Sequence, residues 1–100
     1  MLTRLFLLLV SHCVCDYPLQ GDFLAQGKRG VIPGVPAWVC LLAHSFIHGG
    51  GVFLVTGNLW AAVAEVVLHY LIDWGKCAGQ YSLVDDQALH VICKVYWVLS

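Results

Sequence analysis

The chain has 100 residues, of which 60% are hydrophobic and 11% charged, whereas a typical soluble domain carries about 25% charged residues. The length permits one domain, and about four membrane-spanning helices of roughly 20 residues would use nearly all of it. A formal net charge of −1 lacks the basic excess of nucleic-acid-binding proteins, so nucleic acid is excluded as a partner.

We therefore predict an all-α fold, an integral membrane bundle of about four helices with the lipid bilayer as its partner. The single transmembrane domain covers residues 1–100, with helices at about 2–25, 37–57, 59–74 and 83–99. The first segment is apolar as far as Cys15 and then amphipathic, with Pro18 as an expected kink. Its apolar start imitates a signal peptide, but no small-residue cleavage site follows, so we expect a helix of the bundle.

Glycines and prolines in the loop KRGVIPGVP separate the first segment from the second, AWVCLLAHSFIHGGGVFLVTG. The second segment is long enough to span a bilayer, although its three consecutive glycines weaken an isolated helix. Small residues mark helix interfaces in membranes, so these glycines predict close helix contact. Asn58 is the expected N-cap of the third segment. The third and fourth segments are short for full spans, which predicts little tilt or local thinning of the bilayer.

Basic residues suggest an orientation in the membrane. Lys28, Arg29 and Lys76 fall on one side of a four-span bundle, whereas the turn between the second and third segments has no basic residue. The positive-inside rule then places both termini outside the cytoplasm. Arg4 and Lys94 oppose this orientation.

Cysteine and aromatic residues give weaker signals. The five cysteines are scattered and lack CxxC spacing, so most are expected to be small buried hydrophobic residues. The four tryptophans are expected to be interface anchors or packing residues.

All five histidines fall within the predicted helices, four residues from an acid or from each other. These sets are His12 with Asp16, His44 with His48, Glu65 with His69 and Asp73, and Asp86 with His90. Residues four apart share one helix face, so each helix offers a polar stripe to a common interior. A charged side chain at mid-helix costs about 2.5–3.5 kcal/mol on membrane insertion. The stripes should therefore face inward and pair with each other, with water or with a cation.

Imidazole and carboxylate groups together suit Zn, Mn or Fe, and two ligands at i and i+4 on one helix can hold one ion. The sequence therefore predicts a divalent metal ion as cofactor, with candidate ligands His12, His44, His48, His69, Asp73, Asp86 and His90. Glu65 and Asp16 are the candidate catalytic groups, either as general bases or as supports for the ligands. Gln20 and Gln87 are candidates to orient substrate. Asp85 is left out of the site, and a single histidine such as His12 also suits an interhelical hydrogen bond.

Four stretches carry these polar residues: HCVCDYPLQGDFLAQGK, LLAHSFIHG, EVVLHYLIDWGK and DDQALHVI. In these stretches and in their order, the chain resembles a domain-of-unknown-function family of small bacterial and phage integral membrane proteins. The resemblance implies a bacterial inner membrane location but no activity. It also implies a shared polar signature of His12, Asp16, Gln20, Asp22, His44, His48, His69, Asp73, Asp86, Gln87 and His90.

Three functions compete at this point. The leading hypothesis is an intramembrane metal site, which as a catalyst would hydrolyse a lipid-linked or membrane substrate with metal-activated water. The second is a proton or cation pathway through the same side chains. The third is a structural or phage-accessory protein whose cluster only locks the helices together. Interhelical hydrogen bonds contribute only about 0.6 kcal/mol each, so this third function ranks last. Whether the protein is an enzyme and whether it forms a homo-oligomer stay open.

Overall fold

The computed structural model describes residues 1–99, which contain five α-helices and no strand. The helices are α1 (Leu2–Asp16), α2 (Gly21–Gly27), α3 (Ala37–Thr56), α4 (Leu59–Cys77) and α5 (Leu83–Leu99). The prediction of an all-α fold is confirmed. The first predicted helix is two helices, because the chain turns by 82° between α1 and α2. Pro18 lies in this break, where it cannot continue the hydrogen-bonding pattern of a helix.

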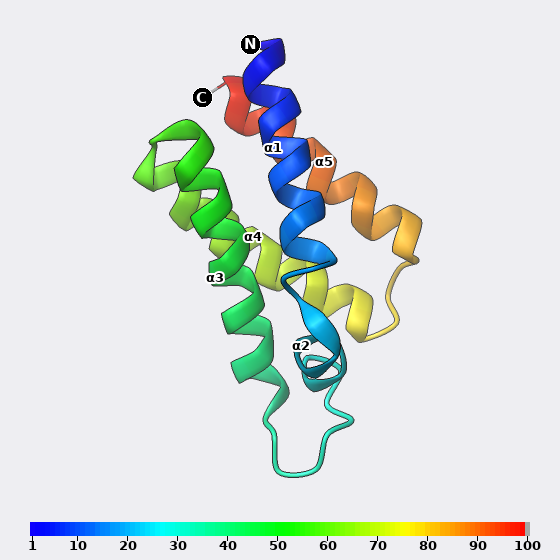
Figure 1. Ribbon diagram of the computed structural model, residues 1–100. Coiled ribbons are helices and arrows are strands. Elements are labelled where there is room, and N and C mark those ends of the chain that lie inside the picture. Colours follow the sequence, from blue (N-terminus) through cyan, green and yellow to red (C-terminus); the bar gives the residue numbers. More distant parts are fainter. Residues whose placement is uncertain (100) are drawn as a thin grey trace.

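The long helices α1, α3, α4 and α5 run alternately in opposite directions, and α2 lies beside the loop that leads to α3 (Figure 1). The two termini and the α3–α4 turn gather toward one end of the molecule, and the α2–α3 and α4–α5 loops lie away from that end (Figure 1). We call these the terminal end and the loop end. The molecule measures 43 × 23 × 22 Å along its principal axes.

The sharp turn between α3 and α4 has a local cause. Gly57 ends α3 in a left-handed conformation, with φ of 65°, and its N–H donates to the carbonyl of Phe53 at 2.7 Å. The Asn58 side chain then accepts hydrogen bonds from the backbone N–H groups of Trp60 and Ala61, at 3.0 and 3.2 Å. The predicted N-cap at Asn58 is confirmed.

The triple glycine of α3 brings this helix close to two neighbours. A Cβ atom on Gly49 would collide with Val66 and lie 3.0 Å from the carbonyl oxygen of Ala62, both in α4. A Cβ atom on Gly51 would collide with the hydroxyl of Ser11 in α1. The glycine between them faces open space. The predicted close helix contact is therefore confirmed for the first and third glycines.

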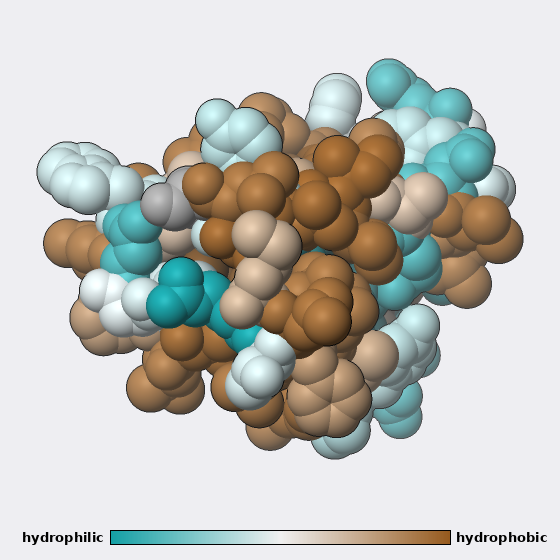
Figure 2. Space-filling model, turned by 90° about the horizontal axis from the view of Figure 1, so that it is seen from above, coloured by the Kyte–Doolittle hydropathy of each residue, from teal (hydrophilic) through white to brown (hydrophobic). Residues whose placement is uncertain are grey.

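The distribution of polarity is the reverse of that in a soluble domain. The small apolar core consists of Leu8, Val52, Ala61 and Trp97. Large apolar side chains lie on the surface instead: Leu54 is 86% exposed and Leu71 is 55% exposed. Hydrophobic residues dominate the face seen in Figure 2, which also carries smaller hydrophilic areas. The remaining buried positions are occupied largely by polar and charged side chains.

By length and composition, α3 is the one helix within residues 1–99 that could cross a membrane. The bent pair of α1 and α2 would be a second span if it is taken as one segment. Helices α4 and α5 each carry three or more charged side chains, namely Glu65, Asp73 and Lys76 in α4 and Asp85, Asp86 and Lys94 in α5. The structure therefore establishes a helical fold, whereas the four-span membrane bundle stays a prediction.

The five cysteines are free. Only Cys15 and Cys40 are buried, while Cys77 and Cys93 are half-buried and Cys13 is exposed. The expectation that most cysteines are fully buried is wrong, because three of them lie on helix faces that other helices do not cover completely.

Candidate metal centre

The five histidines form one cluster of rings in the interior. His12 comes from α1, His44 and His48 from α3, His69 from α4 and His90 from α5. The rings of His48 and His69 stack with centroids 3.7 Å apart, and those of His69 and His90 stack at 4.1 Å. The ring centroid of His44 lies 5.0 Å from that of His69, and the ring centroid of His12 lies 5.2 Å from those of both His48 and His90. Histidine rings from all four long helices therefore meet in one cluster.

Asp16 and three of these histidines form a group with the geometry of metal ligands. Asp16 Oδ1 lies 3.2 Å from His44 Nε2 and 3.3 Å from His48 Nε2. One potential ligand atom from each of Asp16, His44, His48 and His69 lies within 4.8 Å of the others. A tetrahedral zinc site with bonds of about 2.0–2.1 Å sets its ligand atoms about 3.3 Å apart. We call these four residues the His3Asp group; the separations of Asp16 from His44 and His48 match this value, and the remaining ones are at most 4.8 Å.

Several ring nitrogens in the cluster lack hydrogen-bond partners within residues 1–99. They include Nε2 of His48 and both nitrogens of His69. Buried polar atoms are normally satisfied, so each unpaired nitrogen calls for an explanation. A metal ion that accepts the nitrogen lone pairs would supply the missing partner.

A second set of potential ligands, Glu65, His69 and His90, shares His69 with the first. Both oxygens of Glu65 are already engaged, because Lys94 Nζ donates to Oε1 at 2.5 Å and Trp97 Nε1 donates to Oε2 at 2.8 Å. Glu65 Oε1 also lies 3.5 Å from His69 Nδ1. Glu65 therefore lies beside the His69 ring, while its hydrogen bonds go to Lys94 and Trp97.

Asp73 lies at the side of the cluster that faces the loop end. Lys28 Nζ donates to Asp73 Oδ2 at 2.8 Å and to Gln20 Oε1 at 2.5 Å. The same Asp73 oxygen lies 3.8 Å from His44 Nε2. Asp73 therefore pairs with a buried ammonium group and contacts the His3Asp group only at its edge.

Gln87 links three other members of the cluster. Its Nε2 donates to Asp16 Oδ2 at 2.9 Å and to Asp86 Oδ2 at 3.1 Å. Its Oε1 lies 3.0 Å from His12 Nε2. Asp86 Oδ1 lies 3.3 Å from His90 Nε2. This network holds Asp16 through its Oδ2 atom, while the Oδ1 atom faces His44 and His48.

The charges of the cluster do not balance. Four carboxylates meet two ammonium groups there, and four minus two leaves a net charge of −2 when all imidazoles are neutral. The carboxylates of Glu65, Asp73 and Asp86 are buried, and the Asp16 side chain is only 12% exposed. Uncompensated buried charge is costly, so a single divalent cation would balance this interior.

The structure brings together all the site residues predicted from the sequence: Glu65 lies beside His69, and the others fall in three neighbourhoods. The first is the His3Asp group, the second is Lys28 with Asp73 and Gln20, and the third is Gln87 with His12, Asp86 and His90. Asp85, which was left out of the site, is exposed.

Two buried residues were missed by the sequence analysis, which treated Lys28 and Lys94 only as orientation signals. Lys94 follows Asp86 and His90 at the same spacing of four, a pattern that could have revealed it. Lys28 lies in the turn after α2, outside any such periodicity.

The sequence of this chain is similar to those of a known protein family and of one curated protein. The profile of the family described as "Protein of unknown function (DUF3307)" matches residues 4–99. One similar curated protein is the choline O-acetyltransferase of Drosophila melanogaster, 29% identical over 86 residues that make up 81% of this chain and 12% of that enzyme. No solved structure matches the chain. Because the family profile covers nearly the whole chain, the protein belongs to the family of proteins of unknown function DUF3307.

Proposed function

We propose that the protein is an integral membrane protein that binds one divalent metal ion at the His3Asp group. The observation that carries this proposal is the convergence of Asp16, His44, His48 and His69 from three helices, with ligand atoms within 4.8 Å of one another. Three imidazoles and one carboxylate suit zinc best, with Mn and Fe as the alternatives. With all imidazoles neutral, the cluster carries a net charge of −2, which supports a divalent rather than a monovalent ion.

The membrane part of the proposal rests on the inverted polarity and the dimensions. The long axis of 43 Å is similar to the thickness of a bilayer with its headgroups, about 40–45 Å. Trp38 and Trp60, which are 60% and 79% exposed, lie near the starts of α3 and α4, toward opposite ends of the bundle. Exposed tryptophans at both ends are typical of membrane proteins, where they lie among the headgroups. The location in a bacterial inner membrane rests on the resemblance alone and stays a prediction.

Hydrolysis by this metal ranks below metal binding. Four protein ligands close a tetrahedral site, whereas catalytic zinc keeps one position for water or substrate. Hydrolysis of a lipid-linked substrate therefore requires one ligand of the His3Asp group to give way to a water molecule.

A proton or cation pathway is the second candidate, because the stacked rings of His48, His69 and His90 form a continuous row. Buried lysines lie toward both ends of the cluster, where Lys28 bonds to Asp73 and Lys94 bonds to Glu65. Both ammonium groups are held in buried ion pairs at the ends of the row, and breaking such a pair is costly. Metal-free protein in liposomes should therefore leave a proton gradient intact, whereas dissipation of the gradient would favour the pathway.

The metal content of untagged protein, purified in detergent and measured by elemental mass spectrometry, tests the proposal. The matched variants are His44→Gln, which removes a ligand of the His3Asp group, and His90→Gln, which alters only the second set. We expect about one ion per chain in the wild type and in His90→Gln, and loss of the ion in His44→Gln. A wild type that stays free of metal after supplementation contradicts the proposal. Loss of metal in His90→Gln alone would assign the ion to the second set.

A further inference from the structure

A pocket of about 480 Å³ opens at the loop end, between the region of α2 and the last turn of α4. Its polar lining consists of Gln20, Gln26, Lys28, Arg29 and Lys76. No member of the His3Asp group lines it. The metal proposal therefore assigns this pocket no role.

Two of the three cationic side chains that line the pocket form no ion pair within residues 1–99. Lys28 is buried and bonds to Asp73 and Gln20, so its charge is compensated. Arg29 is exposed and Lys76 is half-buried, and neither forms an ion pair with a residue of the described range 1–99. Two cations without ion pairs in the described range thus line one pocket, together with the amide of Gln26. A dianion would neutralise the pair.

We propose that this pocket binds a phosphate group, either that of an anionic lipid headgroup or free inorganic phosphate. A guanidinium matches phosphate oxygens with two parallel N–H donors, and an ammonium group adds a flexible third contact. Basic pockets between helices at the cytoplasmic side of membrane proteins recognise acidic lipid headgroups. The phosphate site stands independently of the metal, whereas a lipid as its source rests on the proposed membrane location.

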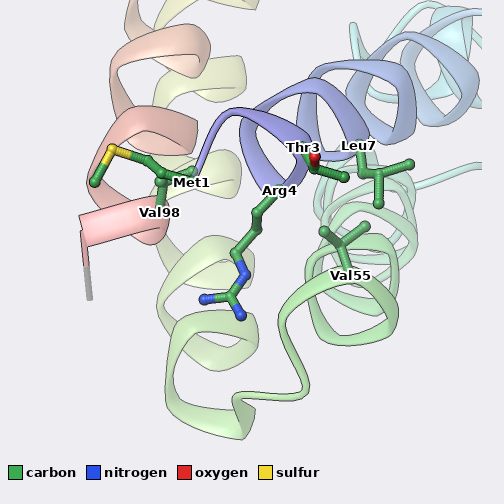
Figure 3. Close-up of a pocket in the computed structure, with 6 residues that line it drawn as sticks. All are labelled: Met1, Thr3, Arg4, Leu7, Val55 and Val98. Atoms are coloured by element: carbon green, nitrogen blue, oxygen red, sulfur yellow. The ribbon is translucent and has the colours of Figure 1, made fainter.

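A pocket of similar size at the terminal end provides a contrast. It measures about 460 Å³ and is lined by Met1, Thr3, Arg4, Leu7, Val55 and Val98. Figure 3 shows the Arg4 side chain extending from α1 past these mostly apolar neighbours. This pocket has one cationic side chain where the loop-end pocket has three. Arg4 is therefore a matched control for Arg29, because both are exposed arginines at opposite ends of the molecule.

The test is a calorimetric titration of the full chain in a neutral detergent. The probes are dihexanoyl phosphatidic acid, inorganic phosphate and, as a zwitterionic control, dihexanoyl phosphatidylcholine. The variants are Arg29→Gln, Lys76→Gln, their double variant, and the control Arg4→Gln. Circular dichroism and metal content are measured on every variant to show that the bundle and the cluster persist.

We expect saturable binding of phosphatidic acid to the wild type and to Arg4→Gln. Each loop-end substitution should weaken binding about tenfold or more, because each removes one charge-assisted contact. Phosphatidic acid that binds at least tenfold tighter than phosphate identifies a lipid headgroup as the source, and equal affinities identify phosphate itself.

Three results would overturn the site: no saturable binding of either anion, unchanged affinity in the double variant, or an equal loss in Arg4→Gln. Equal binding of phosphatidylcholine would overturn it as well, since the pocket would then not select for anionic charge. A double variant that loses phosphate binding and keeps its metal shows that the two sites are separate. Phosphate binding by a protein without metal would contradict the proposed function and leave this inference standing.

Discussion

Asp16 contacts more members of the cluster than a single pairing requires: His44, His48 and Gln87. One carboxylate oxygen faces His44 and His48, and the other accepts the hydrogen bond of Gln87. It lies at the last residue of α1, immediately before the break to α2. In the proposed metal site Asp16 is the anionic ligand, so we expect its charge to matter more to metal affinity than its volume.

The substitution Asp16→Asn keeps the shape of the side chain and removes its charge. We expect metal affinity to fall by at least about 100-fold, because even the supports of metal ligands contribute 10- to 100-fold. Asp85→Asn is the matched control, since Asp85 is exposed and outside the cluster. Competition with a chromophoric chelator measures both variants. Equal affinities in the two variants would remove Asp16 from the site.

Lys94 is buried against Glu65, so its removal leaves a carboxylate without its cation. We expect Lys94→Met to lower the free energy of unfolding by about 3–5 kcal/mol, the usual effect of breaking a buried pair. The double variant Lys94→Met/Glu65→Gln should recover much of that loss. Lys76→Met, at a half-buried position without an ion pair in the described range, should change stability by less than about 0.5 kcal/mol. Denaturant unfolding in detergent measures all three, and a fully stable Lys94→Met would show that the pair is not needed.

The sequence alone predicted the convergence of histidines and acids, because a spacing of four places side chains on one helix face. It could not predict which carboxylate meets which cation. Glu65 and Lys94 lie 29 positions apart, and Lys28 and Asp73 lie 45 apart. Such pairings depend on helix rotation and packing, which one-dimensional periodicity does not contain. Lys28 was missed for the same reason, whereas the spacing of Lys94 from Asp86 and His90 could have revealed it.

At the scale of helices, the glycines of α3 set its distance from α4 and α1. Gly49 has no room for a Cβ atom beside Val66 and Ala62, whereas Gly50 faces open space. We expect Gly49→Ala to destabilise the bundle by about 1–3 kcal/mol through overpacking. Gly50→Ala should leave stability unchanged or raise it by up to about 1 kcal/mol, because alanine favours the helix.

Thermal unfolding of the two alanine variants is a controlled comparison, since the same methyl group is added at adjacent positions of one helix. Metal affinity should also fall in Gly49→Ala, because α3 carries His44 and His48 toward the His69 ring of α4. Equal unfolding temperatures for both variants would contradict the close approach of α3 to α4.

The ends of the helices were predicted with mixed success. Local chemistry determines the α3–α4 turn, so Asn58 could be identified as a cap from the sequence. The kink at Pro18 was also expected, but the 82° bend was not. The size of a bend depends on what α2 packs against, and its packing on α3 is a tertiary contact.

For the whole molecule, the number of membrane crossings is still to be measured. The composition predicts four crossings, whereas one helix within residues 1–99, or two with the bent pair, is long and apolar enough by itself. Four alternating crossings require both termini and the α3–α4 turn on one side of the membrane. Impermeant maleimide labelling of a cysteine-free chain tests this arrangement in intact cells. The exposed positions Thr3 and Leu59 report the terminal end, and exposed Arg29 reports the loop end.

We expect Thr3→Cys and Leu59→Cys to react in intact cells and Arg29→Cys to react only after lysis, since the positive-inside rule places the loop end in the cytoplasm. Reaction of all three only after lysis, together with extraction by alkaline carbonate, would contradict membrane integration. Labelling of Arg29→Cys alone in intact cells would show that the orientation is the opposite one, with the same four crossings.

In the proposed site, three imidazoles and one carboxylate hold a metal ion in the interior of the helical bundle. X-ray absorption spectroscopy of the metal that co-purifies with the chain tests it most directly. We expect a shell of about four nitrogen and oxygen atoms near 2.0–2.1 Å, with the outer-shell scattering of about three imidazole rings. That scattering should decrease in His44→Gln and persist in His90→Gln. A shell of oxygen alone, or one that contains sulfur from the buried cysteines, would contradict the His3Asp site.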